Sequence, residues 1–155
     1  MEPWIGSRKF KRGRSMIVEV DFNSDEALYI QLRNQIIVGI ACDRLLPGDT
    51  LPSVRQLASD IGINMHTVNK AYAVLRQEGF VKLDRRKGAV IAVDEDKMKT
   101  LAQIRHDMGV LLAAASCKNV TREEIHRLVD SIYDEFPCQC RKYQEKKQED
   151  QTNVM

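Results

Sequence analysis

The sequence lacks the features of a membrane-spanning or secreted protein. Among its 155 residues, no apolar run approaches the roughly 18 residues that a helix needs to cross a bilayer. No apolar signal-peptide core follows the basic start of the chain either. We therefore expect a cytoplasmic protein, in which the four cysteines (Cys42, Cys117, Cys138 and Cys140) are reduced thiols and not a disulfide framework.

Signatures of catalysis are also missing. The chain contains no phosphate-binding glycine loop, no Gly-x-Ser-x-Gly nucleophile motif and no His-Glu-x-x-His metal motif. His106 and His126 lie among charged neighbours on expected helices, where an exposed surface histidine is the simpler interpretation. Because an active site must be argued from a set of groups, we predict that the chain is not an enzyme and has no cofactor or resident metal.

Neither sign of charge is in large excess, since 24 Lys and Arg residues face 22 Asp and Glu residues and leave a net charge of +2. The position of the cations says more than their sum. Five of them crowd residues 8–14, and Arg85, Arg86 and Lys87 form a second cluster. The apolar fraction is that of a globular protein, so a packed core is feasible.

Apolar periodicity predicts three helices before residue 80. From Ala27 to about Arg44 an apolar residue recurs every four positions, and Pro47 and Gly48 end the pattern. Ser53 and Gln56 fit a capping box at the start of a short helix.

Gly62 suits the left-handed position that ends this short helix. A longer helix is expected from about Met65 to Glu78, followed by Gly79. Two short helices joined by a tight turn are typical of a helix-turn-helix.

After Gly79 the apolar period shortens to about two, which predicts a β-hairpin. Val81 and Leu83 alternate with polar residues, 85–88 form the turn, and 89–93 form the second strand. A hairpin directly behind the second helix of the motif is a wing. The predicted fold is therefore mainly α (α+β), with a winged helix-turn-helix over residues 16–94.

A winged helix-turn-helix presents the first turn of its second helix to base edges in the major groove of DNA. Asn, Thr and Lys side chains there can contact bases or phosphates, and a cationic wing tip can lie along the minor groove. Taken alone, Arg55 or His66 is more simply explained as a solvated surface residue. The prediction of DNA binding is supported by the joint placement of such residues at one helix start and one wing. The candidate DNA-binding residues are Ser53, Arg55, Asn64, Met65, His66, Thr67, Asn69, Lys70, Arg85, Arg86, Lys87 and Gly88.

Residues 95–137 predict a second segment of two helices. The first has apolar residues spaced 3, 4, 3 and 4 apart, and the second starts at Thr121 with a Thr121/Glu124 capping box and ends at Pro137. Two helices cannot bury both apolar stripes against each other, so they pack on a partner chain or on the first helix of their own chain. The candidate homodimer residues are Leu101, Ile104, Met108, Leu111, Ala115, Ile125, Leu128 and Ile132.

Three sequence blocks stand at fixed spacing between Leu46 and Val93: LPS-VR-LA over 51–58, TV-KAY over 67–72 and L-EGF over 75–80. These blocks resemble the DNA-binding domain of the GntR family of bacterial transcriptional regulators. The resemblance implies that Arg55 contacts DNA from the second helix. It places Asn64, His66, Thr67 and Asn69 at the groove and Lys87 and Gly88 at the wing tip. Many members have Arg or Ser/Thr where this chain has Met65, His66 and Asn69, so the family's usual base preferences are not carried over.

Only about sixty residues follow Val93, which resembles the YtrA-type subgroup with its short helical C-terminal segment. The subgroup implies a homodimeric repressor that binds a palindromic operator, often for an operon of an ABC-type transporter. No deep effector pocket is expected in so short a segment.

Two alternatives concern the remaining parts of the chain. Cys117, Cys138 and Cys140 could form a thiol- or metal-responsive site, against the simpler interpretation of three reduced thiols. Residues 1–15 are expected to be a flexible basic arm, which either adds minor-groove contacts or is a leader without a role. Residues 138–155 are expected to be a disordered polar tail.

Overall fold

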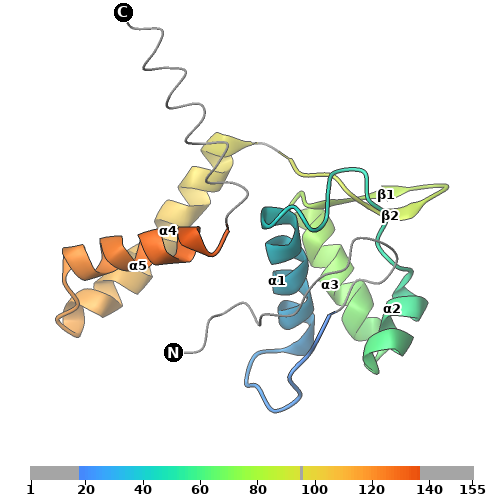
Figure 1. Cartoon of the computed structure of the whole chain (residues 1–155), viewed down its shortest axis with the longest axis horizontal. Coiled ribbons are helices and arrows are strands. Elements are labelled where there is room, and N and C mark those ends of the chain that lie inside the picture. The colour runs from blue at the N-terminus through green and yellow to red at the C-terminus, as the bar shows by residue number, and fades with distance from the viewer. Residues whose placement is uncertain (1–17, 95, 137–155) are drawn as a thin grey trace, which may run out of the picture. The chain divides into compact units, whose positions relative to one another are not determined.

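The computed structural model describes residues 18–94 and 96–136 of the chain (Figure 1). The chain divides into two compact units, residues 1–94 and 95–155. The predicted basic arm and polar tail, with Cys138 and Cys140, lie outside the described residues. In the part of the chain that the structure describes, no helix is long and apolar enough to span a membrane.

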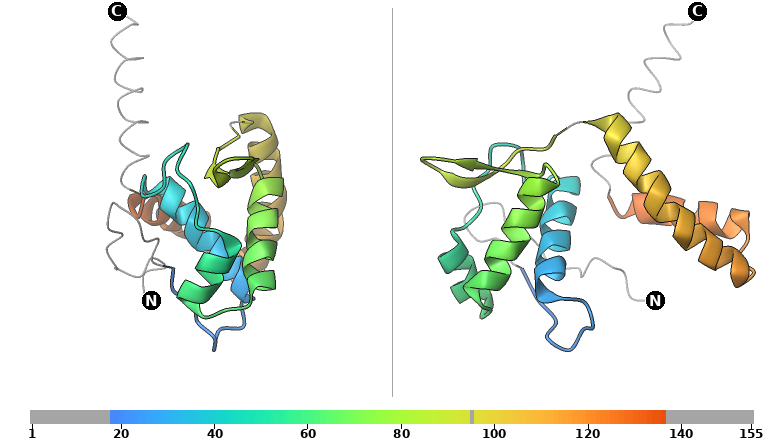
Figure 2. Two further views of the ribbon diagram at one scale, coloured as in Figure 1. Left: turned by 90° about the vertical axis from the view of Figure 1, so that its right-hand side faces the viewer. Right: turned by 180° about the vertical axis from the view of Figure 1, so that it is seen from behind.

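The first unit is a winged helix-turn-helix, as predicted (Figure 2). Its elements are α1 (Leu28–Ala41), α2 (Val54–Ile61), α3 (Met65–Gln77), β1 (Val81–Asp84) and β2 (Gly88–Ile91). The two strands are antiparallel, with Val81 opposite Ile91 and Asp84 opposite Gly88. The second strand ends two residues earlier than expected, at Ile91.

The end of α1 also differs from the expected position near Arg44. The backbone N–H groups of Arg44 and Leu45 both donate to the carbonyl of Gly39, at 2.8 and 3.0 Å. Asp43 takes a left-handed conformation with φ 52°. These bonds close the last turn and satisfy a carbonyl that the helix would otherwise leave unpaired, so α1 ends at Ala41.

One apolar core joins the elements of the first unit. Its largest fully buried side chains are Leu32, Ile36, Leu57, Val68, Leu75 and Ile91. Each such side chain stabilises the fold by about 1.5–3 kcal/mol relative to an exposed position. Because α3 contributes a buried residue at nearly every turn on one side, its opposite side is fixed toward solvent.

Two glutamine amides hold the segment that precedes α1. The Gln31 side chain is buried, accepts from Asp21 N at 2.8 Å and donates to the carbonyls of Asp21 and Glu26. The Gln35 amide pairs in the same way with the backbone N–H and carbonyl of Glu19. Two side chains of α1 thus supply hydrogen-bond partners to backbone groups of residues 19–26. The sequence pattern did not reveal this contact.

Gly79 joins α3 to the wing in a conformation that other residues adopt only with strain. Its φ is +83°, and a Cβ atom there would lie 2.9 Å from Asp94 Cβ. We expect Gly79→Ala to lower the free energy of unfolding by about 2–4 kcal/mol, from left-handed backbone strain and overpacking together. Urea denaturation measures the change.

Gly62→Ala is the matched control, since Gly62 has φ +78° with open space around the position of its Cβ. It is expected to cost only the strain of about 1–2 kcal/mol. Equal losses for the two variants would show that the contact with Asp94 contributes nothing.

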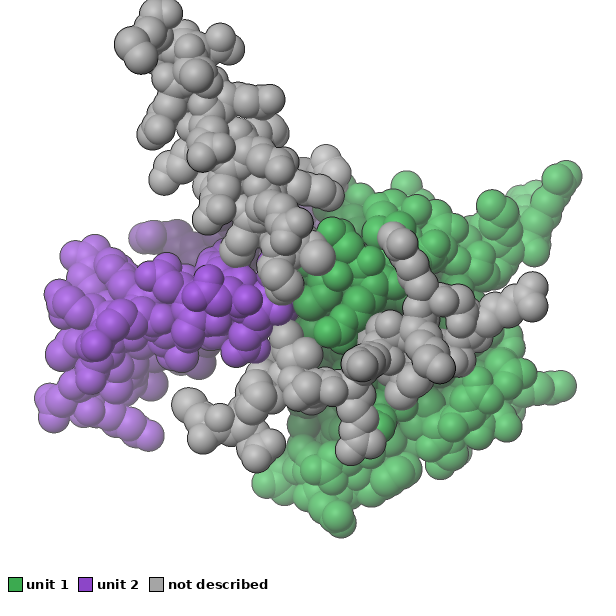
Figure 3. All heavy atoms as spheres, in the orientation of Figure 1, with its two compact units in different colours: residues 1–94 green, residues 95–155 purple. Residues whose placement is uncertain are grey.

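The second unit consists of α4 (Lys97–Cys117) and α5 (Arg122–Asp134), which Figure 3 colours separately from the first unit. The predicted capping box is confirmed: Glu124 N donates to Thr121 Oγ1, and Thr121 N donates to the Glu124 carboxylate. Asp96 caps α4 by accepting from Lys99 N at 3.0 Å. None of the described side chains of α4 or α5 is fully buried.

Candidate nucleic-acid interface

One side of α3 forms an exposed ridge. The buried residues Val68, Ala71, Tyr72 and Leu75 share one side of the helix. At about 3.6 residues per turn, the opposite side carries His66, Asn69, Lys70 and Ala73, all of them exposed. We call these four residues the α3 ridge. Met65 is also exposed, whereas Thr67 is half-buried.

The structure gives Asn64 a role in starting α3. Its side-chain oxygen accepts from His66 N at 2.8 Å, which makes it the N-cap of the helix. A two-pronged contact with adenine needs both the oxygen and the nitrogen of an asparagine amide. Since the oxygen of Asn64 is engaged, Asn69 on the α3 ridge is the better candidate for such a contact.

Arg55 is exposed and lies in the first turn of α2. Ser53 caps the helix by accepting from Gln56 N at 3.1 Å. The predicted capping box is incomplete, because Gln56 donates its amide to Asp60 Oδ1 at 2.7 Å instead of reaching back to Ser53. Ser53 therefore has a structural role besides any contact with a phosphate.

A buried tyrosine fixes α2 relative to α3. The Tyr72 hydroxyl donates to the carbonyl of Pro52 at 2.8 Å. Burial raises the pKa of Tyr72 well above its usual value, so the hydroxyl keeps its proton and remains a donor. The bond holds Pro52, the residue before Ser53, against α3. It therefore fixes the position of the first turn of α2, which carries Arg55, relative to the α3 ridge.

Lys70 differs from the other ridge residues, because its ammonium group lies over an aromatic ring of α1. Lys70 Nζ is 3.9 Å from the centroid of the Tyr29 ring. A cation at this distance is attracted to the negative face of the ring. Lys70 is therefore held toward the α1 side of the ridge.

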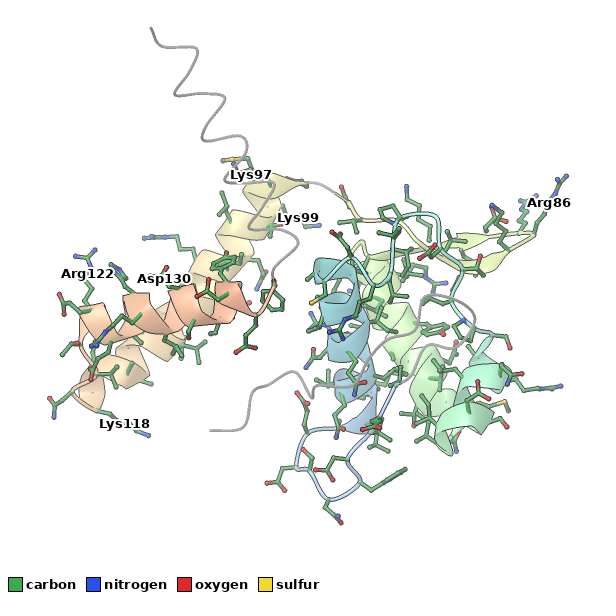
Figure 4. All side chains as sticks on the ribbon, viewed as in Figure 1. Arg86, Lys97, Lys99, Lys118, Arg122 and Asp130 are labelled. Carbon is green, nitrogen blue, oxygen red and sulfur yellow. The ribbon has the colours of Figure 1, made fainter. Side chains whose placement is uncertain are left out.

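The wing ends in a tight turn organised by Asp84. Its Oδ1 accepts from the backbone N–H groups of Arg86 at 2.7 Å and Lys87 at 2.8 Å. These two bonds, with the charge of Lys87, hold the pKa of Asp84 below its usual value. Gly88 closes the turn with φ +79°, and Arg86 projects from the end of the wing (Figure 4).

A third segment supports the base of the wing. Leu51 N donates to the carbonyl of Ala89, and Ile91 N donates to the carbonyl of Asp49. Thr50 forms an antiparallel bridge with Val90. The strand that carries the basic tip is thus paired on both sides, which limits its movement relative to the core.

The turn at Asp84 predicts opposite results for two substitutions. Asp84→Ala removes the acceptor of both N–H groups, so the tip loses its order and DNA affinity is expected to fall roughly three- to tenfold. Asp84→Asn keeps an acceptor and removes a negative charge from the wing tip, which is expected to lie near DNA phosphates, so affinity is expected to be equal or higher.

Fluorescence anisotropy with a labelled duplex measures both variants. If Asp84→Asn weakens binding as much as Asp84→Ala does, the proposed role of the turn is wrong.

The second unit exposes a broad apolar face. Of the candidate dimer residues, Met108, Ala115 and Ile125 are half-buried within the unit, whereas the other five are exposed. Other exposed apolar side chains, which the 3-4 spacing missed, are Met98, Leu112 and Tyr133, whereas Val110 is exposed on the side of α4 opposite Leu101. Because Met98 and Leu112 fall on the same side of α4 as Leu101 at about 3.6 residues per turn, the apolar face of α4 is wider than a narrow seam.

The alternative of a metal site gains no support from the described residues, where no group of three or more His, Cys, Asp or Glu side chains is placed to hold an ion. Cys117 is exposed at the end of α4. Cys138 and Cys140, the other two thiols of that hypothesis, lie outside residues 18–94 and 96–136.

Comparison with known proteins gives matches to bacterial regulators. Residues 25–91 match the family model "Bacterial regulatory proteins, gntR family". The chain is 31% identical over 121 residues to the HTH-type transcriptional repressor YtrA of Bacillus subtilis (strain 168), covering 75% of this chain and 92% of that one. It is 33% identical over 103 residues to the HTH-type transcriptional regulator Rv1152 of Mycobacterium tuberculosis, covering 66% and 85%.

Two solved structures have a similar fold. A transcriptional antiterminator from Listeria monocytogenes EGD-e matches with a TM-score of 0.70 and 30% identity, over 80% of this chain and 95% of that one. YtrA from Sulfolobus acidocaldarius, a GntR-family transcription factor, matches with a TM-score of 0.51 and 38% identity, over 61% and 99%.

Proposed function

We propose that this chain, which belongs to the GntR family, acts as a homodimeric repressor on a palindromic operator. Its family and its YtrA relatives show that it is a DNA-binding transcriptional regulator and not an enzyme. In this proposal α3 enters the major groove with its exposed ridge. Arg55 and the wing tip contact the flanking DNA, and α4 and α5 join two copies of the chain. The relative named YtrA from Bacillus subtilis is itself a transcriptional repressor.

The exposed apolar face of the second unit is the observation that supports the homodimer. Leu101 and Leu111 are 50% and 67% exposed in the single chain, and Leu128 and Ile132 of α5 are 46% and 44% exposed. Exposed apolar faces of this kind typically mark interaction sites. A second copy of the chain offers the same face, as a two-fold interface requires.

A two-fold dimer explains how so small a DNA-binding unit selects one site. Each copy presents one α3 ridge, so the two ridges contact half-sites about one helical turn of DNA apart, or a multiple of it. The two half-sites are then inverted copies of each other. A dimer bound to an operator that overlaps a promoter would exclude the polymerase, which is how we propose that the chain represses transcription. The proposed target, the operon of an ABC-type transporter, comes from the resemblance to the YtrA-type subgroup.

Selection of bound duplexes from a random-sequence DNA pool tests this proposal. We expect enrichment of an inverted repeat, bound by two chains per duplex in a sedimentation measurement. In a transcription assay with a promoter that carries the repeat, the chain is expected to lower the amount of transcript. An enriched sequence without a repeat would contradict the dimer, and an increased amount of transcript would contradict the repressor.

A further inference from the structure

α1 and α3 lie side by side (Figure 2); besides their apolar packing, a cation–ring contact and an ion pair link α1 to α3 and to its C-cap residue Glu78. The first is the contact of Lys70 Nζ with the Tyr29 ring at 3.9 Å. In the second, Arg33 donates to both carboxylate oxygens of Glu78, from Nε and from Nη2, at 2.8 Å each. Arg33 lies one helical turn after Tyr29, so the two contacts lie on one side of α1.

These contacts fix the Tyr29 ring relative to α3. Tyr29 is half-buried in the first turn of α1 and packs against the apolar core. The two-pronged Arg33–Glu78 pair restrains the same stretch of α1 against the end of α3. The ring is therefore a fixed surface against which the Lys70 side chain is held.

The ring leaves part of the Lys70 ammonium group available. An ammonium group has three N–H donors, and a ring below it contacts one side of the group only. Lys70 itself is exposed, so the remaining donors face solvent. A phosphate oxygen that approaches from that side can accept from them while the ring contact is kept.

The contact of Lys70 with the Tyr29 ring favours a phosphate over a base as its partner. In a helix that lies in the major groove, residues at the centre of the exposed side meet base edges, and phosphates line the walls of the groove. Tyr29 holds Lys70 toward the α1 side of the ridge, which restricts how far its chain reaches along the centre. His66 and Asn69 have no such link to α1 among the interactions of the described residues.

We propose that Tyr29 is a positioning residue that holds Lys70 for contact with a DNA phosphate, so that Lys70 adds affinity without selecting sequence. Selection is then left to other residues of the α3 ridge and to Arg55. This inference rests on the docking of α3 given under the proposed function. A lysine that is already held in place loses less rotamer freedom when it binds, which is how Tyr29 contributes to affinity.

The test compares full-length variants on two probes: the duplex that the wild-type chain enriches from a random pool, and a scrambled duplex of equal length. Affinities are measured by anisotropy over a series of salt concentrations. Lys70→Met is expected to weaken binding roughly fivefold on both probes, and to lower the salt slope by about one per chain. A loss confined to the enriched duplex would show a base contact and overturn the proposal.

The role of Tyr29 is tested by a double-mutant cycle. Tyr29→Phe keeps the ring and is expected to bind as the wild type does. Tyr29→Leu is expected to weaken binding roughly two- to fivefold, and to have no further effect in the Lys70→Met background. An equal loss in both backgrounds would show a merely structural role for Tyr29 and overturn the proposal.

Two controls complete the design. Lys118→Met removes the same charge at the α4–α5 turn, and an equal fall in its salt slope would overturn the proposal by showing an effect of net charge. The scrambled probe separates this inference from the proposed function. If the wild-type chain prefers no sequence, the operator proposal fails, while the salt slopes and the cycle on the scrambled duplex still decide the role of Lys70.

Discussion

Replacing Leu101 and Leu111 together by glutamate is expected to convert the dimer into a monomer and to weaken operator binding by roughly a hundredfold or more. In a two-fold interface each substitution occurs twice, so four carboxylates would enter an apolar contact. Each buried, unpaired charge costs several kcal/mol, more than a dimer of moderate affinity can compensate. The first unit should stay folded, because neither leucine belongs to its core.

Operator binding falls with the dimer because a monomer engages one half-site alone. Joining two DNA-binding units raises their combined affinity by roughly two to four orders of magnitude without any new contact. Multi-angle light scattering gives the mass of the variant, and anisotropy with the enriched duplex gives its affinity.

Val110→Glu is the matched control for this variant. Val110 is 72% exposed on the same helix, but it shares its side of α4 with Gln103 and Asp107, which hydrogen-bond to each other at 2.9 Å. It is expected to leave both the mass and the affinity unchanged. A double-glutamate variant that remains a dimer would show that the chains join through another surface.

Arg55→Ala is expected to weaken binding to the enriched duplex roughly thirtyfold or more, because a base contact worth about 1–3 kcal/mol is lost in each of the two half-sites. Arg55 is exposed in the first turn of α2. The Tyr72–Pro52 hydrogen bond fixes that turn relative to α3. The planar guanidinium group of an arginine loses less freedom per hydrogen bond than a lysine ammonium does when it binds a guanine edge or a phosphate.

The scrambled duplex shows which of these two contacts Arg55 makes. A larger loss on the enriched duplex indicates a base contact, and equal losses indicate a phosphate contact. Arg127→Ala in α5 is the control, since Arg127 is an exposed arginine of the second unit and its removal is expected to change neither affinity. Unchanged binding by Arg55→Ala would show that α2 does not contact DNA through Arg55.

The backbone plan of the first unit could be predicted from sequence because its signals are local. Gly62 and Gly79 occupy left-handed positions in the structure, as the ends of two short helices require. The change of apolar period after Gly79 located the wing. The family blocks added nothing to these boundaries but indicated what the exposed residues contact.

The side-chain contacts of the site could not be predicted, since they join residues far apart in sequence. Tyr29 and Lys70 meet only because α1 packs against α3. The role of Asn64 was ambiguous for another reason: the same side chain suits both an N-cap and an adenine contact. In the second unit, the 3-4 spacing identified a seam but not the width of the exposed apolar face.

Whether the chain binds DNA sequence-specifically can be decided by one titration. The purified chain is titrated at several salt concentrations against the enriched duplex and against the scrambled duplex of equal length. We expect tighter binding to the enriched duplex at every salt concentration, with both affinities falling as salt rises. Equal affinity for the two duplexes, or binding to neither, would contradict sequence-specific binding.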